Sequence, residues 1–173
     1  MDHVDRVIRQ WGQQRPDLDV RPMELIARLR RISDHMAREM ERTFADHGLT
    51  TAGFDVLATL RRAAPDDGLS PGDLIDQMLV TSGTMTHRIN LLVKAGLVVR
   101  LPNPNDGRGA VVRLTAAGRS LIDRVLADHV LTQARLVASL DAASFRSLNE
   151  LLRDYAATFE DELSDDRSTR QQD

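Results

Sequence analysis

Cysteine is absent from this 173-residue sequence, and that absence excludes several kinds of chemistry. Without a thiol the chain has no disulfide, no thiolate nucleophile and no Cys-ligated zinc. One-step sensing of peroxide by a thiol is excluded for the same reason. Any signal that the protein senses must therefore arrive in another way.

Long apolar runs are also missing. No stretch approaches the roughly 18 consecutive apolar residues that a membrane-spanning helix needs. The N-terminal segment MDHVDRVIRQW mixes charged with apolar residues and does not form the apolar centre of a signal peptide. We therefore expect a cytoplasmic protein with no membrane partner.

Catalytic and metal-binding patterns are lacking too. No nucleophile stands beside a base, and no acid pair or nucleotide-binding loop is recognisable, so we predict neither enzyme activity nor a cofactor. The histidines are scattered over separate predicted elements and form no ligand motif, so we predict no metal site, although a metal sensor stays an alternative. They are His3, His35, His47, His87 and His129.

The composition is that of an ordinary globular protein, with 42% hydrophobic and 28% charged residues, and the length predicts one folding unit. Helical periodicity predicts an N-terminal extension helix over 1–15 and a long helix from Pro22 to His47. The last predicted helix, from about Ala142 to Leu163, has an apolar seam with steps of three and four residues, which is typical of a packed helix pair. The tail 164–173 has no apolar residue and is predicted to be disordered.

Residues 50–114 contain the pattern that points to function. Thr50, Ser70 and Thr81 are predicted N-caps of three successive short helices. The runs LVVRL and AVVRL then flank PNPNDGRG, which predicts a β-hairpin with a basic tip. The fold class is therefore mainly α with a small β-hairpin wing, the winged helix-turn-helix arrangement.

The helix that begins at Thr81 is the predicted DNA-reading element. Small and hydrogen-bonding side chains at its N-terminal end suit the major groove: Ser82, Gly83, Thr84, Thr86, His87 and Arg88. At the hairpin tip Arg108 can reach phosphate or the minor groove. The alternative is a helical interaction protein without DNA binding, whose helices have a solvated polar face.

Charge is distributed to match the DNA-binding prediction. The chain has a net charge of -3, but residues 81–113 hold five basic side chains against the single acid Asp106. That segment is therefore basic while the rest of the chain is acidic. The asymmetry is typical of a local binding surface for DNA on an otherwise acidic protein.

The stretch DGRGAVVRLTAAG resembles the wing of the MarR family of bacterial regulators, through Asp106, Arg108, Leu114, Thr115 and Gly118. The resemblance implies a homodimer with interleaved terminal helices, formed by regions 16–49 and 115–163. Such a dimer reads a pseudo-palindromic operator with half-sites roughly 34 Å apart. In the family Asp106 holds the wing arginine by a salt bridge, and capping of the turn is an equal alternative here.

The extension helix adds a second resemblance, to the urate-responsive MarR subfamily, carried by Trp11, Asp55 and Arg88. It implies a small anionic ligand, either urate or another purine, or a tricarboxylate such as citrate or aconitate. Taken singly, each residue also has an ordinary role, in packing, at a helix start or on DNA. A tricarboxylate would need more cations, and the nearest supply is Arg28, Arg30 and Arg31.

Overall fold

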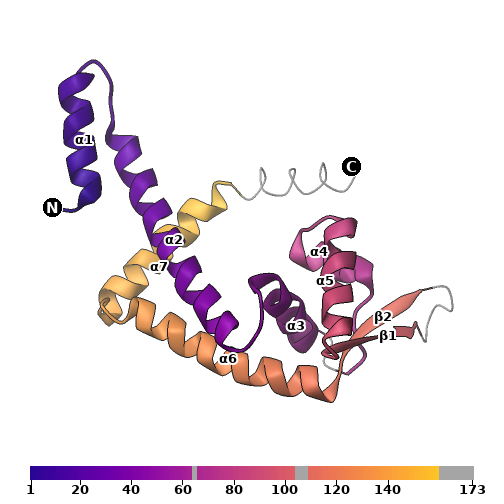
Figure 1. The fold of residues 1–173 in the computed structure, drawn as a ribbon. Helices are drawn as coiled ribbons and strands as arrows, with labels where there is room; N and C mark the ends of the chain where they lie inside the picture. The colour runs from indigo at the N-terminus through magenta and orange to yellow at the C-terminus, as the bar shows by residue number, and fades with distance from the viewer. Residues whose placement is uncertain (64–65, 104–108, 160–173) are drawn as a thin grey trace. The chain divides into compact units, whose positions relative to one another are not determined.

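The computed structural model describes residues 1–63, 66–103 and 109–159 (Figure 1). Seven helices and one two-stranded hairpin occur in these ranges, so the predicted fold class is confirmed. In chain order they are α1 (His3–Gln14), α2 (Arg21–Asp46), α3 (Thr51–Ala63), α4 (Pro71–Met78), α5 (Ser82–Lys94), β1 (Val98–Pro102), β2 (Ala110–Leu114), α6 (Ala116–Val137) and α7 (Ala142–Ala157). The predicted wing contacts Asp106 and Arg108 and the predicted tail 164–173 lie outside the described residues.

The chain divides into two compact units, residues 1–42 and 43–173. This differs from the single folding unit that the chain length predicts. The physical reason is that the contacts of the first 42 residues are mostly with one another, through α1 and the first part of α2. None of the helices in the described ranges is long and apolar enough to span a membrane.

In the first unit, the start of α1 is set by a capping box. Asp2 and Asp5 exchange hydrogen bonds from backbone N–H to side-chain carboxylate, at 2.6 and 2.9 Å. This arrangement satisfies two amide groups that would otherwise be unpaired at the helix start. Val4 on α1 is 3% exposed and is the buried apolar residue of this helix.

In the second unit, α3 lies at the centre of the core. It contacts α4, α5, α6 and β2, and its side chains Val56, Leu57 and Leu60 are fully buried. The core is completed by apolar residues of the surrounding elements, each at most 1% exposed: Leu74, Met85, Ile89, Val98, Val112, Ile122 and Val125. Burial of such side chains is the main favourable term in folding, so these contacts hold the winged helix-turn-helix together.

Local caps explain where α4 and α5 begin. Ser70 and Asp73 form a capping box, and Pro71 occupies the first turn of α4. Thr81 caps α5 by accepting a hydrogen bond from the Thr84 amide. Between the two helices Leu79 has φ 56° and ψ 46°, the left-handed conformation, which makes the tight turn of the helix-turn-helix.

The hairpin is attached to the core on both sides. β1 and β2 pair antiparallel, with Val98 opposite Leu114 and Pro102 opposite Ala110. Leu69 forms an additional bridge to Val112, with backbone N–O distances of 3.0 and 2.8 Å. The wing is therefore anchored to the segment that leads into α4.

Candidate nucleic-acid interface and effector site

The outer face of α5 has the exposure that a reading helix needs. Five predicted DNA-contacting residues are exposed, and on the opposite side Met85, Ile89 and Leu92 are buried. The five are Ser82, Gly83, Thr84, Thr86 and His87. A Cβ added at Gly83 would have no atom within 4 Å, so the start of the helix is open to an approaching partner.

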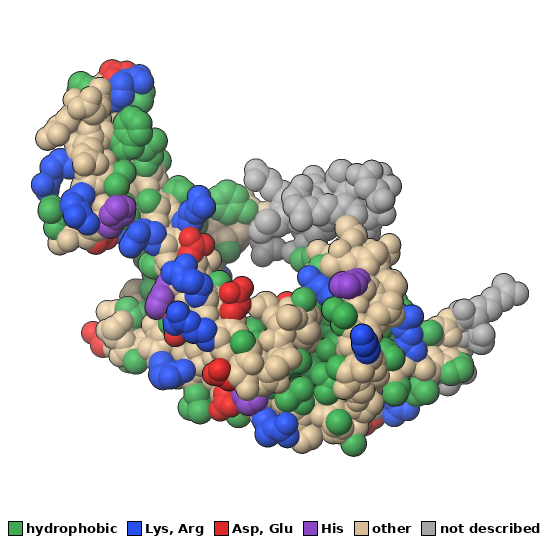
Figure 2. Space-filling model, in the orientation of Figure 1, with side chains coloured by type: hydrophobic (Ala, Val, Ile, Leu, Met, Phe, Trp, Pro, Cys, Tyr) green, Lys and Arg blue, Asp and Glu red, His purple; other side chains and the backbone are tan. Residues whose placement is uncertain are grey.

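Basic side chains lie on the surface formed by α5 and the hairpin, as Figure 2 shows in blue. Lys94, Arg100 and Arg113 are exposed, and because strand pairing places Val99 opposite Arg113 and Arg100 opposite Val112, the two arginines lie on opposite faces of the hairpin. Cations on a protruding hairpin can reach phosphate groups beside a groove. The two described strands of the wing therefore present positive charge.

Arg88 differs from its neighbours because it is only half-buried, neither fully exposed nor part of the core. It interacts electrostatically with Asp55, which is half-buried on α3, the helix that packs against α5. Burial raises the pKa of Asp55, and the positive charge of Arg88 partly offsets that shift. Among the described residues no ion pair of 4.0 Å or less joins Asp55 and Arg88, so the two charges interact at a longer distance.

His129 on α6 is a third member of this cluster, and the sequence analysis missed it. Its charge also acts on the Asp55 carboxyl, and burial lowers the pKa of His129 while Asp55 raises it. The ring packs against Phe44 and Phe54, with centroid distances of 5.2 and 4.9 Å. The sequence spacing could have identified His129, because it lies at helical spacing from Val125 and Thr132, which are buried on the core-facing side of α6.

Trp11 lies on α1 in the first unit and is 44% exposed. It lines a shallow hollow with Val7 and the glutamines of the same helix. A tryptophan that serves only as a packing anchor is normally more buried. Its side chain is thus available for contact, while Asp55 and Arg88 belong to the other unit.

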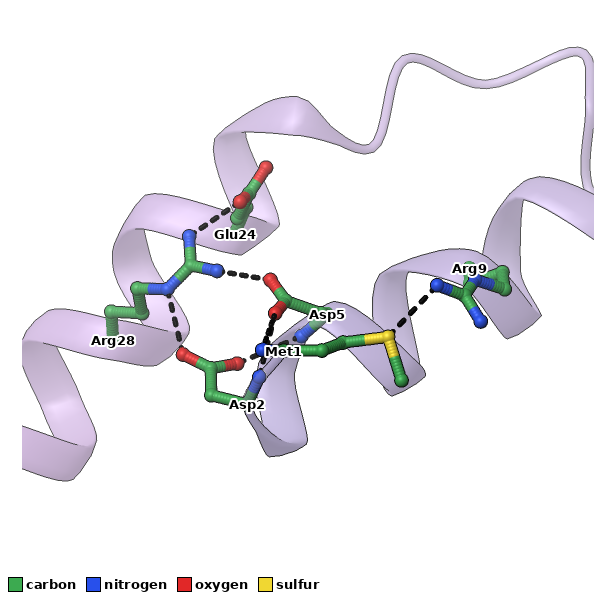
Figure 3. Close-up of polar contacts among 6 residues, drawn as sticks. All are labelled: Met1, Asp2, Asp5, Arg9, Glu24 and Arg28. Carbon is green, nitrogen blue, oxygen red and sulfur yellow. Dashed lines mark hydrogen bonds and ion pairs between the residues drawn. The ribbon is translucent and has the colours of Figure 1, made fainter.

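Of the three arginines suggested as cations for a tricarboxylate, Arg28 is already paired with carboxylates (Figure 3). The Arg28 guanidinium donates to Asp2 at 3.0 Å and also to Asp5 and Glu24. Its hydrogen bonds to Glu24 and then to Asp2 raise the pKa of Arg28. Arg28 therefore fastens α1 to α2 and is not a free cation, whereas Arg30 lies 3.9 Å from Asp34 and Arg31 is exposed.

Metal binding finds no support within the ranges that the structure describes. No group of three or more histidine and acidic side chains is placed there to hold an ion. His47 Nε2 instead lies 2.8 Å from Asp128 Oδ2, in a two-residue contact that links the start of the α2–α3 loop to α6.

Comparisons with known proteins agree with this geometry. The family model described as MarR family matches residues 47–109. The chain is 34% identical over 149 residues to the HTH-type transcriptional regulator PecS of Dickeya dadantii, covering 86% of this chain and 90% of that protein. It is 36% identical over 107 residues to the multiple antibiotic resistance protein MarR of Escherichia coli, covering 61% and 72% of the two chains.

A solved structure shows the same fold on DNA. The crystal structure of a mutant MarR from Escherichia coli complexed with operator DNA has a TM-score of 0.65 and 26% sequence identity. The match covers 84% of this chain and 96% of that one. The apo form of wild-type MarR from the same organism matches with a TM-score of 0.63 and 28% identity, over 76% of this chain and 95% of that one.

Proposed function

Since this chain belongs to the MarR family of DNA-binding transcription regulators, which are not enzymes, we propose that it is a ligand-responsive repressor. In this proposal a homodimer binds a pseudo-palindromic operator and is released by a small anionic molecule. The observation that carries the proposal is the pair of half-buried charged residues Asp55 and Arg88 on the packed helices α3 and α5, because Arg88 lies on the reading helix itself.

The DNA contacts are assigned to the N-terminal half of α5 and to the wing. We assign the major groove to the polar face of α5, and phosphate or the minor groove to the hairpin. The assigned residues are Ser82, Gly83, Thr84, Thr86, His87, Arg88, Asp106 and Arg108. Support comes from the exposure of the α5 residues and from the operator complex of the Escherichia coli relative.

A second copy of the chain is the proposed partner of α7. This helix has no buried residue, although it is amphipathic and carries Phe145, Leu148, Leu151, Leu152 and Tyr155 at 40–68% exposure. A row of large apolar side chains of this kind is unfavourable in water and marks an interface. The homodimer with interleaved terminal helices covers it.

The proposed ligand-binding residues are Trp11, Asp55 and Arg88, with Arg88 attracting the negative charge of the ligand. An anion bound there changes the electrostatic balance between α3 and α5 and shifts the reading helix. Ligand and DNA then oppose each other through a coupling free energy of about 1–3 kcal/mol. Because Arg28 already contacts three carboxylates, the site favours a urate-like purine over a tricarboxylate such as citrate or aconitate.

DNA binding is tested by titrating the protein with its own promoter DNA at several salt concentrations. Affinity is expected to fall steeply with salt, because phosphate contacts release counterions. Absent or salt-insensitive binding contradicts the regulator assignment and favours an interaction protein without DNA function.

Ligand response is tested with urate, xanthine, citrate and aconitate, read by the fluorescence of Trp11, the single tryptophan, and by DNA affinity. At least one compound is expected to change both signals in the wild type. Arg88→Ala and Asp55→Ala are expected to lose the response. A panel that changes neither signal contradicts the effector site, and a response to divalent metal alone favours a metal sensor.

A further inference from the structure

His129 is held in an apolar environment that leaves one of its nitrogen atoms without a hydrogen bond. Phe44 and Phe54 stack on each other at a centroid distance of 4.2 Å, and the imidazole packs against both rings. Its Nδ1 atom is buried and has no hydrogen-bond partner among the described residues. A buried polar atom without a partner lowers the stability of the folded state, and an apolar ring at this position would avoid that cost.

The charged groups that act on His129 belong to the proposed effector site. The Asp55 charge acts on His129, and Arg88 acts on the same Asp55 carboxyl. These three side chains come from α3, α5 and α6, which all belong to the second unit. His129 contacts Phe54, the residue directly before Asp55 on α3, and α3 packs against both α6 and the reading helix α5, which carries Arg88. An imidazole with an unused nitrogen, a carboxylate and a cation therefore lie on three helices that meet at α3.

We propose that His129 is a ligand-binding residue of the effector site and that its Nδ1 atom forms a hydrogen bond with the bound ligand. This inference rests on the proposed ligand response and adds a residue to it. A neutral imidazole nitrogen either donates or accepts, according to its tautomer. The site therefore recognises a ligand with one anionic group for Arg88 and a further N–H, hydroxyl or carbonyl group for His129.

Two substitutions separate this role from simple core packing. His129→Phe keeps an aromatic ring against Phe44 and Phe54 but removes both nitrogens. His129→Asn keeps a polar atom close to the position of Nδ1. If His129 served packing alone, the Phe variant would be at least as stable as the wild type and would bind ligand equally well, because it only loses an unpaired polar atom.

Thr132→Val is the matched control on the same helix. Thr132 is also a buried polar residue, but its hydroxyl lies 2.8 Å from that of Thr43 and is therefore satisfied. Its replacement is expected to lower the melting temperature and to leave ligand affinity unchanged. Thr132→Val thus shows how a general destabilisation of α6 affects the melting temperature and the ligand affinity.

The experiment titrates the full-length wild type and the three variants with urate and, separately, with citrate, and measures the melting temperature and operator affinity of each. For the probe that binds the wild type, His129→Phe is expected to weaken binding by about tenfold or more, with an unchanged or higher melting temperature. His129→Asn is expected to recover part of that loss. Unchanged probe affinity in both His129 variants overturns the inference but leaves the proposed function intact. A wild type that responds to neither probe is titrated with xanthine and aconitate as well, and the absence of any response to all four compounds overturns the proposed ligand response, and this inference with it.

Discussion

Replacing Gly118 by alanine tests the contact that joins α6 to the end of the reading helix. A Cβ at this position would lie 1.9 Å from the carbonyl oxygen of Leu97, a distance that no pair of such atoms tolerates. The Leu97 oxygen would have to move away from the added Cβ by about 1 Å or more before the two atoms were at an ordinary van der Waals distance. Because Leu97 lies between α5 and β1, the displacement acts directly on the DNA-binding module.

The expected cost follows from the bonds that the Leu97 carbonyl makes. It accepts hydrogen bonds from the Thr115 amide at 3.0 Å and from the Thr115 hydroxyl at 3.2 Å. Losing or weakening both costs about 1–2 kcal/mol, and overpacking adds about 1–3 kcal/mol. Alanine in a helix returns roughly 0.5–1 kcal/mol, so the free energy of unfolding is expected to fall by about 1–4.5 kcal/mol, or roughly 2–18 °C in melting temperature.

Thermal unfolding followed by circular dichroism measures this loss, and operator titration measures its functional consequence, a weaker affinity. Gly12→Ala is the matched control, since a Cβ there meets no atom within 4 Å on a helix. The control is expected to be neutral or stabilising by up to about 1 kcal/mol. If Gly118→Ala were as stable as the control, the steric argument for this glycine would be wrong.

Three further predictions concern other parts of the chain. Burial raises the pKa of Asp55, so its carboxyl holds its proton more tightly when folded. The stability that the protonated Asp55 carboxyl contributes is fully present below its pKa in the unfolded chain, about 4. This stability is lost as the pH rises through the higher pKa of the folded state. Asp55→Asn is therefore expected to melt higher than the wild type at pH 7, with a difference that shrinks toward pH 4; a lower melting temperature at pH 7 contradicts the assignment. Leu79→Gly relieves a left-handed conformation at a half-exposed site and is expected to stabilise by up to about 1 kcal/mol in denaturant unfolding, whereas a marked loss would mean that the Leu79 side chain packs against another element. Leu152→Glu is expected to shift the proposed homodimer toward monomer in light scattering, and Arg153→Glu on the same helix is not; equal behaviour of the two variants argues against α7 as the interface.

Helix boundaries were largely predictable because their determinants are local. The caps at Ser70, Thr81 and Thr115 involve side chains three residues from the amides that they satisfy, so spacing alone reveals them. The predicted long helix from Pro22 to His47 corresponds to α2 at Arg21–Asp46. The hairpin was equally readable, since turn residues separate two β-branched runs.

The candidate site was predictable only in part. The resemblance pointed to Asp55 and Arg88, which are half-buried on the packed helices α3 and α5. It did not point to His129, because a single histidine on an apolar helix face normally belongs to the core. The engagement of Arg28 was also unpredictable, since its partners Asp2 and Asp5 lie more than 20 positions away.

The sequence by itself determined the order of the helices, the winged hairpin and the local excess of positive charge, because periodicity, caps and composition act over a few residues. Only the tertiary structure decided why residue 118 must be glycine, which cation is already paired and which histidine nitrogen is buried without a partner. Those properties depend on atoms brought together from separate helices. No spacing along the chain encodes them, since packing alone sets these distances.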